Sequence, residues 1–282
     1  MLDAEQIRRF YESWKEEPVH REWPHIWRKD IRLESPDGVF ISLNRLKNRL
    51  NFKVIKRLCI QLLPVHIYQS ALNFTFPERV SSKKKSLKAY PLLSSEYIVD
   101  IDAYLGHKPH SHRTRNDEPC SGCIQNAYDL TLEVLEEIEE NYSDVKIIFS
   151  GRSGFHLHVF NFIIEDWSYV DESNLIKSHE VSRFKYTSLL AEAIPHAFDK
   201  AHFALSVDPM RVISMPEGLN AVTGVSCSYL GDSKQFKRLT VEQILRRARG
   251  AKASINGLNW SSADSLEFRP LHSQFDSVSD GG

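Results

Sequence analysis

The chain has 282 residues, of which 41% are hydrophobic and 26% are charged, and its formal net charge at pH 7 is −1. This length and apolar content suffice to bury a full core as one large domain, or as one domain with an insertion. The near-zero charge excludes a general electrostatic attraction to nucleic acid, so any such binding depends on local basic patches. No apolar run approaches the ~20 residues that span a bilayer, and no signal-peptide pattern opens the chain. We therefore expect a cytoplasmic or nucleoid-associated protein with no membrane partner.

The amino-terminal segments predict a helix and a buried aromatic cluster. Residues 3–17 carry apolar side chains at helical spacing, which predicts an amphipathic helix. The aromatic cluster at residues 23–27 is typical of a buried core. Between residues 43 and 63, basic and apolar residues alternate. This stretch is either the solvated face of a helix or a groove that follows a phosphate backbone. A second basic segment, residues 81–85, is either a plain loop or a contact to DNA.

Residues 97–102 place two carboxylates inside an apolar run. Side chains alternate along a strand, so Asp100 and Asp102 share one face. Two buried like charges are costly unless a cation compensates them. The pair therefore predicts a hard divalent metal, Mg²⁺ or Mn²⁺, bound through oxygen ligands.

Residues 106–123 are loop-like and rich in metal ligands. Two thiolates separated by two residues can share one tetrahedral ion with imidazoles, which predicts a structural Zn²⁺. The cysteine count of four suits a reducing compartment better than a disulfide framework. Four ligands are expected from five candidates, with His107 and His112 slightly favoured among the histidines. The candidates are His107, His110, His112, Cys120 and Cys123.

The middle of the chain predicts a helix followed by a strand, a tight turn and a second strand. The helix covers about residues 125–141, and its many glutamates read as a solvated face. Residues 145–149 and 155–164 are the strands. The turn offers a hydroxyl, a guanidinium and an imidazole, from Ser150, Arg152 and His156, which suit a polyphosphate. His158 shares the strand face of His156.

A third acidic position follows the apolar residues 203–207. Asp208 would bring the negative charges at the metal site to three, which suits two divalent ions. Arg211 would orient the nucleotide or the aspartates, or else form a structural salt bridge. Residues 241–251 predict one more helix, and residues 261–282 form a polar tail rich in serine and aspartate.

In their order along the chain, these segments resemble the catalytic small subunit of archaeal and eukaryotic DNA primases, within the archaeo-eukaryotic primase superfamily. The resemblance covers about residues 60–225. It rests on the tyrosine-containing residues 66–71, the Asp-x-Asp strand, the turn at 150–156, and residues 207–224. It implies an α/β fold in which a mixed β-sheet carries the aspartates between flanking helices. The catalytic domain would span residues 1–260, with a zinc-binding insertion at about 105–125.

The resemblance implies metal ligation by Asp100, Asp102 and Asp208, and nucleotide contacts by Ser150, Arg152 and His156. The chain departs from the family in its third motif. Ser214 stands where a second arginine is usual. Asn220 and Val222 stand where a histidine and a lysine usually contact the triphosphate. We expect the metal site to be intact and the triphosphate to be held by fewer cationic groups.

The expected function is a DNA-dependent nucleotidyltransferase that makes or extends primers on single-stranded DNA from NTPs or dNTPs. A gap-filling repair polymerase of the same superfamily is one alternative. A catalytically weakened module that binds DNA through its zinc region is another. A primase large subunit, or another replication or repair protein, is a plausible partner for so compact a chain.

Overall fold

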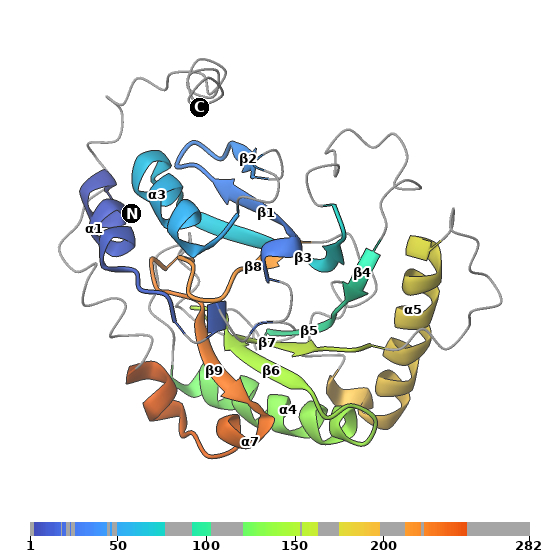
Figure 1. Ribbon diagram of the computed structural model, residues 1–282. Coiled ribbons are helices and arrows are strands. Elements are labelled where there is room, and N and C mark those ends of the chain that lie inside the picture. The colour runs from blue at the N-terminus through green and yellow to red at the C-terminus, as the bar shows by residue number, and fades with distance from the viewer. Residues whose placement is uncertain are drawn as a thin grey trace.

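The structure, a computed structural model, has a mixed α/β fold built on two antiparallel sheets (Figure 1). It describes residues 3–17, 19–20, 23, 26–43, 46, 50–76, 92–102, 121–152, 154–162, 175–197, 212–220 and 223–246. The predicted α/β class is confirmed. The described strands form two sheets where one mixed sheet was expected. Neither sheet is mixed, because every described strand pair is antiparallel.

The first sheet is built mainly from the amino-terminal half of the chain. Its strand order is β2-β1-β3-β4, and β8 also pairs with β3. The strands are β1 (Lys29–Glu34), β2 (Phe40–Ser42), β3 (His66–Phe74), β4 (Leu92–Ser95) and β8 (Val212–Ser214). A short 3₁₀ helix, η1 (Ile26–Arg28), leads directly into β1. Helices α1 (Ala4–Ser13) and α3 (Phe52–Leu62) pack with this sheet in one hydrophobic cluster.

Local hydrogen bonds explain where these two helices begin and how they meet. Asp3 and Gln6 form a reciprocal capping box at the start of α1. The side chain of Asn51 caps α3 by accepting from the Val54 N–H. Lys56 of α3 then donates from Nζ to the carbonyl oxygens of Glu12 and Trp14, each at 2.7 Å. These carbonyls lie at the carboxyl end of α1, so one lysine ties the two helices together.

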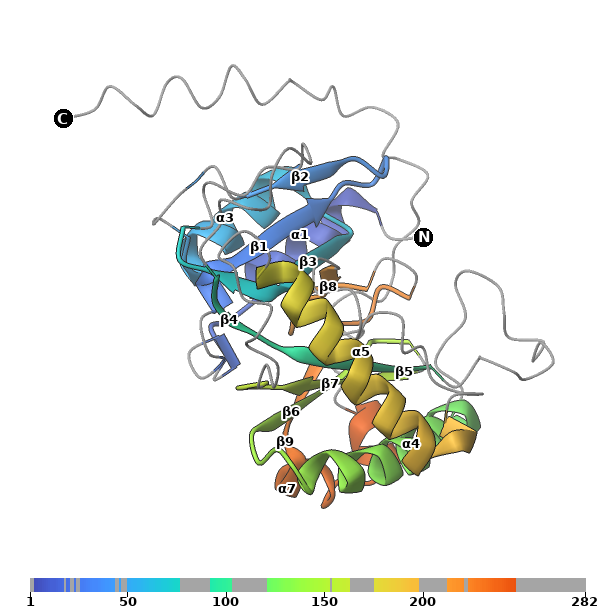
Figure 2. The same ribbon diagram turned by 90° about the vertical axis from the view of Figure 1, so that its right-hand side faces the viewer.

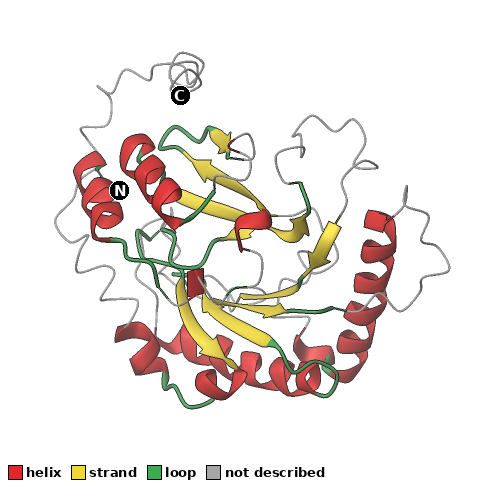
Figure 3. Cartoon of the chain, viewed as in Figure 1, coloured by secondary structure: helices red, strands yellow, loops and turns green. Residues whose placement is uncertain are grey.

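The second sheet has the order β5-β7-β6-β9. Its strands are β5 (Tyr97–Asp102), β6 (Val145–Phe149), β7 (Gly154–Val159) and β9 (Ser228–Asp232). One face is covered by helices α4 (Ser121–Glu139) and α7 (Ser233–Phe236). Helix α5 (Leu175–Ala193) stands beside the sheets, and its carboxyl-terminal part, followed by the 3₁₀ helix η7 (Pro195–Ala197), joins the same core (Figures 2 and 3). The chain is again helical at residues 241–246.

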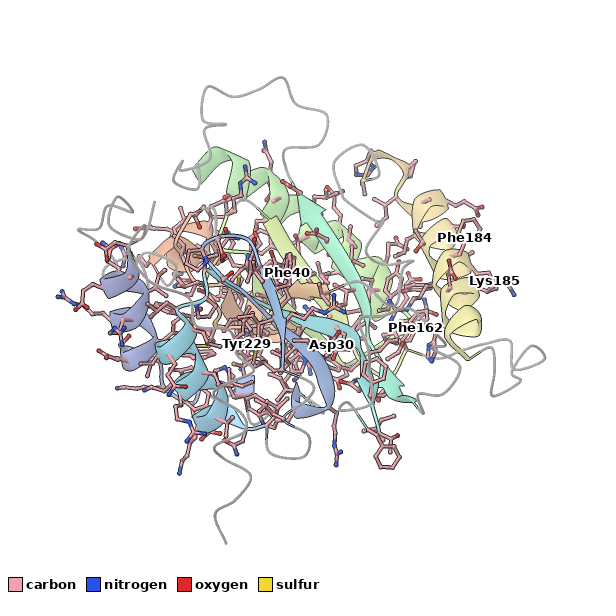
Figure 4. The ribbon with its side chains drawn as sticks, turned by 90° about the horizontal axis from the view of Figure 1, so that it is seen from above. Asp30, Phe40, Phe162, Phe184, Lys185 and Tyr229 are labelled. Atoms are coloured by element: carbon pink, nitrogen blue, oxygen red, sulfur yellow. The ribbon has the colours of Figure 1, made fainter. Side chains whose placement is uncertain are left out.

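Helix α5 leaves part of its surface uncovered. Phe184 is 62% exposed, and Phe184 and Lys185 lie on the outer side of the helix, away from the sheets (Figure 4). No helix among the described residues combines the length and apolar character that crossing a membrane requires.

The predicted helices and strands correspond to observed ones, with shifted ends. The helix expected at residues 3–17 ends at Ser13, because Trp14 adopts an extended backbone. The helix expected at about 125–141 is α4 and begins earlier, at Ser121. The strand at 145–149 is observed as expected, and the next strand is shorter than predicted. The basic segment 81–85 and the polar tail lie outside the described residues.

Candidate active site

Two aspartates of β5 and a histidine of β7 lie side by side on the second sheet. In the antiparallel register, Asp100 is opposite His156 and Asp102 is opposite Gly154. Nε2 of His156 is 3.5 Å from Oδ1 of Asp100. Strand alternation puts both aspartates on one face, as the sequence predicts. The structure therefore brings the first two predicted site segments into direct contact.

The face that carries these groups is turned toward the first sheet. Ile98, on the same face as Asp100, packs against Ala71 of β3 and Ile213 of β8. The side chains that point the other way belong to the core beneath the helices. They are Tyr97, Val99, Ile101, Phe155, Leu157 and Val159. The site therefore lies between the two sheets, where β3 and β8 approach β5 and β7 (Figure 1).

The surroundings of Asp100 and His156 favour the uncharged form of each side chain. Burial, and then the nearby charge of Asp102, raise the pKa of Asp100 to about 7. Burial, and then the neighbouring His158 and His66, lower the pKa of His156 to about 3. His156 is therefore an uncharged imidazole at neutral pH. A divalent cation would compensate the two carboxylates, and carboxylate oxygens are the ligands that Mg²⁺ and Mn²⁺ prefer. The donor set fits such an ion.

The turn between β6 and β7 is organised by the Ser150 side chain. Its Oγ accepts from the N–H groups of Gly154 and Arg152, at 3.2 and 3.4 Å. A Cβ at Gly154 would lie 2.2 Å from the carbonyl oxygen of Ile101, so only glycine allows β7 to approach β5 this closely. The turn and the start of β7 thus lie at the same end of the sheet as the aspartates. They carry the three residues that the sequence predicts to bind nucleotide, Ser150, Arg152 and His156.

Two residues of the third predicted motif, Asn220 and Thr223, also contact this turn. Asn220 is 8% exposed and donates from Nδ2 to the Ser150 carbonyl oxygen at 2.8 Å. Thr223 donates from Oγ1 to the Gly151 carbonyl oxygen at 2.6 Å. The resemblance places Asn220 where a histidine usually contacts the triphosphate. In the structure, its amide binds the protein backbone.

The tyrosine-containing segment on β3 connects to the strand that follows the third aspartate. His66 is hydrogen-bonded through Nε2 to Oγ of Ser214, at 2.7 Å. Tyr68 stacks on His66 with ring centroids 4.2 Å apart and donates to Glu34. Ser214, which replaces an arginine of the resembled family, therefore serves as a polar link between β8 and β3.

A buried charged network lies next to the site and was missed by sequence reasoning. Glu96 forms an ion pair with Lys29 and a 2.9 Å hydrogen bond with Nδ1 of His158. All three side chains are at most 1% exposed. Arg183 of α5 donates to the Glu96 carbonyl oxygen, and Trp23 donates to its side chain. In the sequence, the only indication of this network is that Glu96 directly precedes the apolar strand β5. That position alone does not reveal a buried partner.

Burial alone would raise the pKa of Glu96, but Lys29 and His158 lower it below its ordinary value. Glu96 is therefore an ionised carboxylate. Burial lowers the pKa of Lys29, and the attraction of Glu96 opposes that effect. The pair joins β1 of the first sheet to the link between β4 and β5, and His158 extends the connection to β7.

Several predicted site residues lie outside the described residues. They are Asp208, Arg211, Val222, His107, His110, His112 and Cys120. Cys123 falls in the first turn of α4, and its side chain is not described. Among the described residues, no group of three or more histidine, cysteine, aspartate or glutamate side chains is arranged to hold a metal ion. Zinc binding and the third metal ligand thus stay predictions.

Comparisons with known proteins agree with the resemblance. No family model matches the chain. The DNA primase small subunit of Methanocaldococcus jannaschii is 26% identical over 156 residues, covering 50% of this chain and 43% of the relative. That of Pyrobaculum calidifontis is 24% identical over 170 residues, covering 59% and 47%. An uncharacterized DNA primase small subunit-like protein of Archaeoglobus fulgidus is 25% identical over 182 residues, covering 61% and 59%.

Among solved structures, the chain is similar to the polymerase domain of Mycobacterium tuberculosis Ligase D in complex with DNA. That match has a TM-score of 0.49 and 10% identity, and it covers 91% of this chain and 92% of the other. The chain spans less than half the length of the first two primase relatives. Over about half of its length, the chain is similar in sequence to archaeal DNA primase small subunits.

Proposed function

We propose that this chain is a DNA-dependent nucleotidyltransferase that synthesises or extends primers on a single-stranded DNA template. The observation that carries the proposal is the pairing of Asp100 with His156 across β5 and β7, beside Asp102 and the Ser150 turn. The primase small subunits among its relatives support the same activity.

The proposed reaction joins a primer 3′-oxygen to the α-phosphorus of a nucleoside triphosphate. The bond between the α-phosphorus and the bridging oxygen breaks, pyrophosphate leaves, and the hydroxyl proton passes to solvent. Asp100, Asp102 and Asp208 would hold Mg²⁺ or Mn²⁺. When bound, these cations would lower the energy of the charge that develops on the phosphate and leaving oxygens.

The chain's own groups would orient the nucleotide. His156 is neutral and can donate one N–H to a phosphate oxygen. Arg152 supplies a planar set of donors suited to a phosphate, and Ser150 supplies a hydroxyl. Arg211 would add a further cation. These groups would keep the α-phosphate in line with the attacking oxygen.

The test is nucleotide incorporation by the isolated chain. Single-stranded template, labelled NTPs or dNTPs, and Mg²⁺ or Mn²⁺ are incubated with and without an annealed primer. We expect product in the wild type, and losses of at least ~100-fold in Asp100→Ala, Asp102→Ala and Asp208→Ala. Glu136→Ala, at an exposed position of α4, is the matched control and should retain activity.

The outcomes separate the remaining alternatives. A parallel incubation uses a gapped duplex, and product on that substrate alone would indicate a repair polymerase and overturn the proposal. Template binding without incorporation would indicate a DNA-binding module and would overturn the proposal. An increase in yield on addition of a primase large subunit would identify that partner.

A further inference from the structure

Residues 219–220 and 223–227 form a supporting surface under the turn at Ser150 and Gly151. The loop is closed by a bridge between Leu219 and Ser226 and by a hydrogen bond from Asn220 N to the Val225 carbonyl oxygen, at 2.9 Å. We call this segment the support loop. Three of its side chains, those of Asn220, Thr223 and Cys227, contact the turn.

The support loop satisfies two successive carbonyl groups of the turn. Asn220 Nδ2 and Cys227 Sγ lie 2.8 and 3.3 Å from the Ser150 carbonyl oxygen. Thr223 Oγ1 lies 2.6 Å from the Gly151 carbonyl oxygen. Two carbonyls of neighbouring peptides thus point down into the loop, and side chains hold both.

The backbones of the loop and the turn also touch. Gly151 has φ +77°, and a Cβ there would lie 2.9 Å from the Val225 carbonyl oxygen and 3.1 Å from both Asn220 Cβ and the Ser226 carbonyl oxygen. A side chain at this position would separate the two segments and would also strain the backbone. The contact between them therefore depends on glycine as well as on the hydrogen bonds.

The orientation of the carbonyls sets the orientation of the amides. In a trans peptide, N–H and C=O point to opposite sides. Holding the Ser150 carbonyl on Asn220 therefore directs the Gly151 N–H away from the support loop. Holding the Gly151 carbonyl on Thr223 likewise directs the Arg152 N–H away from the support loop, where it donates to Ser150 Oγ at 3.4 Å. The loop thus fixes the direction of the Gly151 N–H, and with it the side of the turn on which this amide could donate to an anion.

We infer that Asn220 and Thr223 are positioning residues for the nucleotide phosphates, acting through the Ser150–Arg152 turn. This inference rests on the proposed function. It also gives Asn220 a role of its own, beyond being the residue that replaces a phosphate-binding histidine. In the resembled family, this loop contacts the triphosphate directly. In this chain, the support loop would instead hold the Ser150–Arg152 turn in the shape that contacts the triphosphate.

The experiment compares isosteric and conservative changes at Thr223. Thr223→Val removes the hydroxyl and keeps the shape, whereas Thr223→Ser keeps the hydroxyl. Thr223→Val removes the hydrogen bond to the Gly151 carbonyl oxygen and the one that Oγ1 accepts from the Val225 N–H. We expect it to raise the KM for nucleotide roughly three- to tenfold, mainly through the lost contact to the turn, with a smaller change in kcat. Thr223→Ser should restore the wild-type KM. Ser226→Ala is the matched control, because that hydroxyl bonds Ser228 and not the turn.

Direct binding of ATP or dATP with Mn²⁺, measured by calorimetry without template, should show the same order of affinities. Asn220→Ala is a second variant in case Thr223→Val does not fold, and melting temperatures are measured for every variant. If Arg152→Ala loses nucleotide binding while folded Thr223→Val and Asn220→Ala bind like the wild type, the support role is wrong and the nucleotide site stands. If Arg152→Ala binds normally, the proposed nucleotide site itself is wrong.

Discussion

At the residue scale, Asp100 is the side chain whose ionisation should respond most to metal. Its pKa is raised to about 7 by burial and by Asp102. Below that pH the carboxyl is protonated, and a cation must displace the proton before it can bind. Above it, the carboxylate is already ionised. Metal affinity should therefore depend on pH in a range where ordinary aspartates no longer titrate.

We expect Mn²⁺ affinity to rise about tenfold per pH unit up to about pH 7 and then to level off, because one proton is released on binding. Titrations followed by electron paramagnetic resonance at about pH 6 and about pH 8 measure this difference. Asp129→Asn, at an exposed position of α4, should behave like the wild type. Equal affinities at the two pH values would show that Asp100 is not a ligand.

The same raised pKa affects the metal-free protein with a defined sign. Asp100 binds its proton more tightly in the folded state than at its ordinary value of 3.8. Its contribution to stability is therefore full below pH 3.8 and is lost as the pH rises through 7. Without metal, Asp100→Asn should melt at a higher temperature than the wild type above pH 7, since no buried charge remains at that position.

The sequence could predict which groups share a face but not what each one contacts. Alternation along a strand places Asp100 with Asp102 and His156 with His158, and the structure confirms both pairs of faces. The register that puts Asp100 opposite His156 depends on the close approach of Gly154 to Ile101, which a pattern of apolar residues does not specify. The resemblance marks Asn220 as the replacement of a triphosphate-binding histidine; its contact with the Ser150 carbonyl oxygen depends on tertiary packing and is visible only in the structure.

At the scale of elements, the basic residues of α3 separate into two kinds. Lys56 is partly buried and caps the end of α1, whereas Lys53 is exposed. The sequence left open whether this face is solvated or binds DNA. The capping role of Lys56 indicates that at least one basic residue of α3 has a structural role.

We expect Lys56→Gln to lower the free energy of unfolding by about 1–2 kcal/mol, because two carbonyl groups at the end of α1 lose a charged donor. Lys53→Gln should leave it unchanged. Urea unfolding of both variants, with template affinity measured in parallel, checks the assignment. A loss of template affinity in Lys53→Gln at unchanged stability would instead identify this face as a DNA groove.

The predicted zinc element lies before and at the start of α4. We expect about one zinc per chain, bound through thiolate and imidazole ligands. The double variant Cys120→Ser with Cys123→Ser should lose the metal and should lose stability or template binding more than intrinsic chemistry. Metal analysis, melting and incorporation assays measure these effects. A verified zinc-free variant with unchanged melting and full activity would make the element dispensable.

At the scale of the whole molecule, the two sheets are joined by buried charges as well as by apolar contacts. Lys29 belongs to the first sheet and His158 to the second, and Glu96 binds both. Ion pairing at such depth is not readable from sequence, because Lys29 and Glu96 are 67 positions apart and each resembles a surface residue. This part of the fold could not have been derived from local patterns.

Removing one member of this network should be costly, because it leaves its partner charged and buried. We expect Glu96→Gln to lower the free energy of unfolding by about 3–5 kcal/mol. Glu133→Gln, which disturbs an exposed pair with His196, should change it by less than about 1 kcal/mol. Chemical denaturation provides both values. Equal small effects would mean that the network contributes little to the cohesion of the sheets.

The central place of β7 in its sheet has a consequence for amide hydrogen exchange. This strand is hydrogen-bonded on one side to β5 and on the other to β6, and all of its residues are buried. Its amide hydrogens should exchange with deuterium only when the sheet opens as a unit. The three-residue edge strand β2, where Phe40 is 56% exposed, should exchange early. The strand that carries His156 should therefore be among the last segments to take up deuterium.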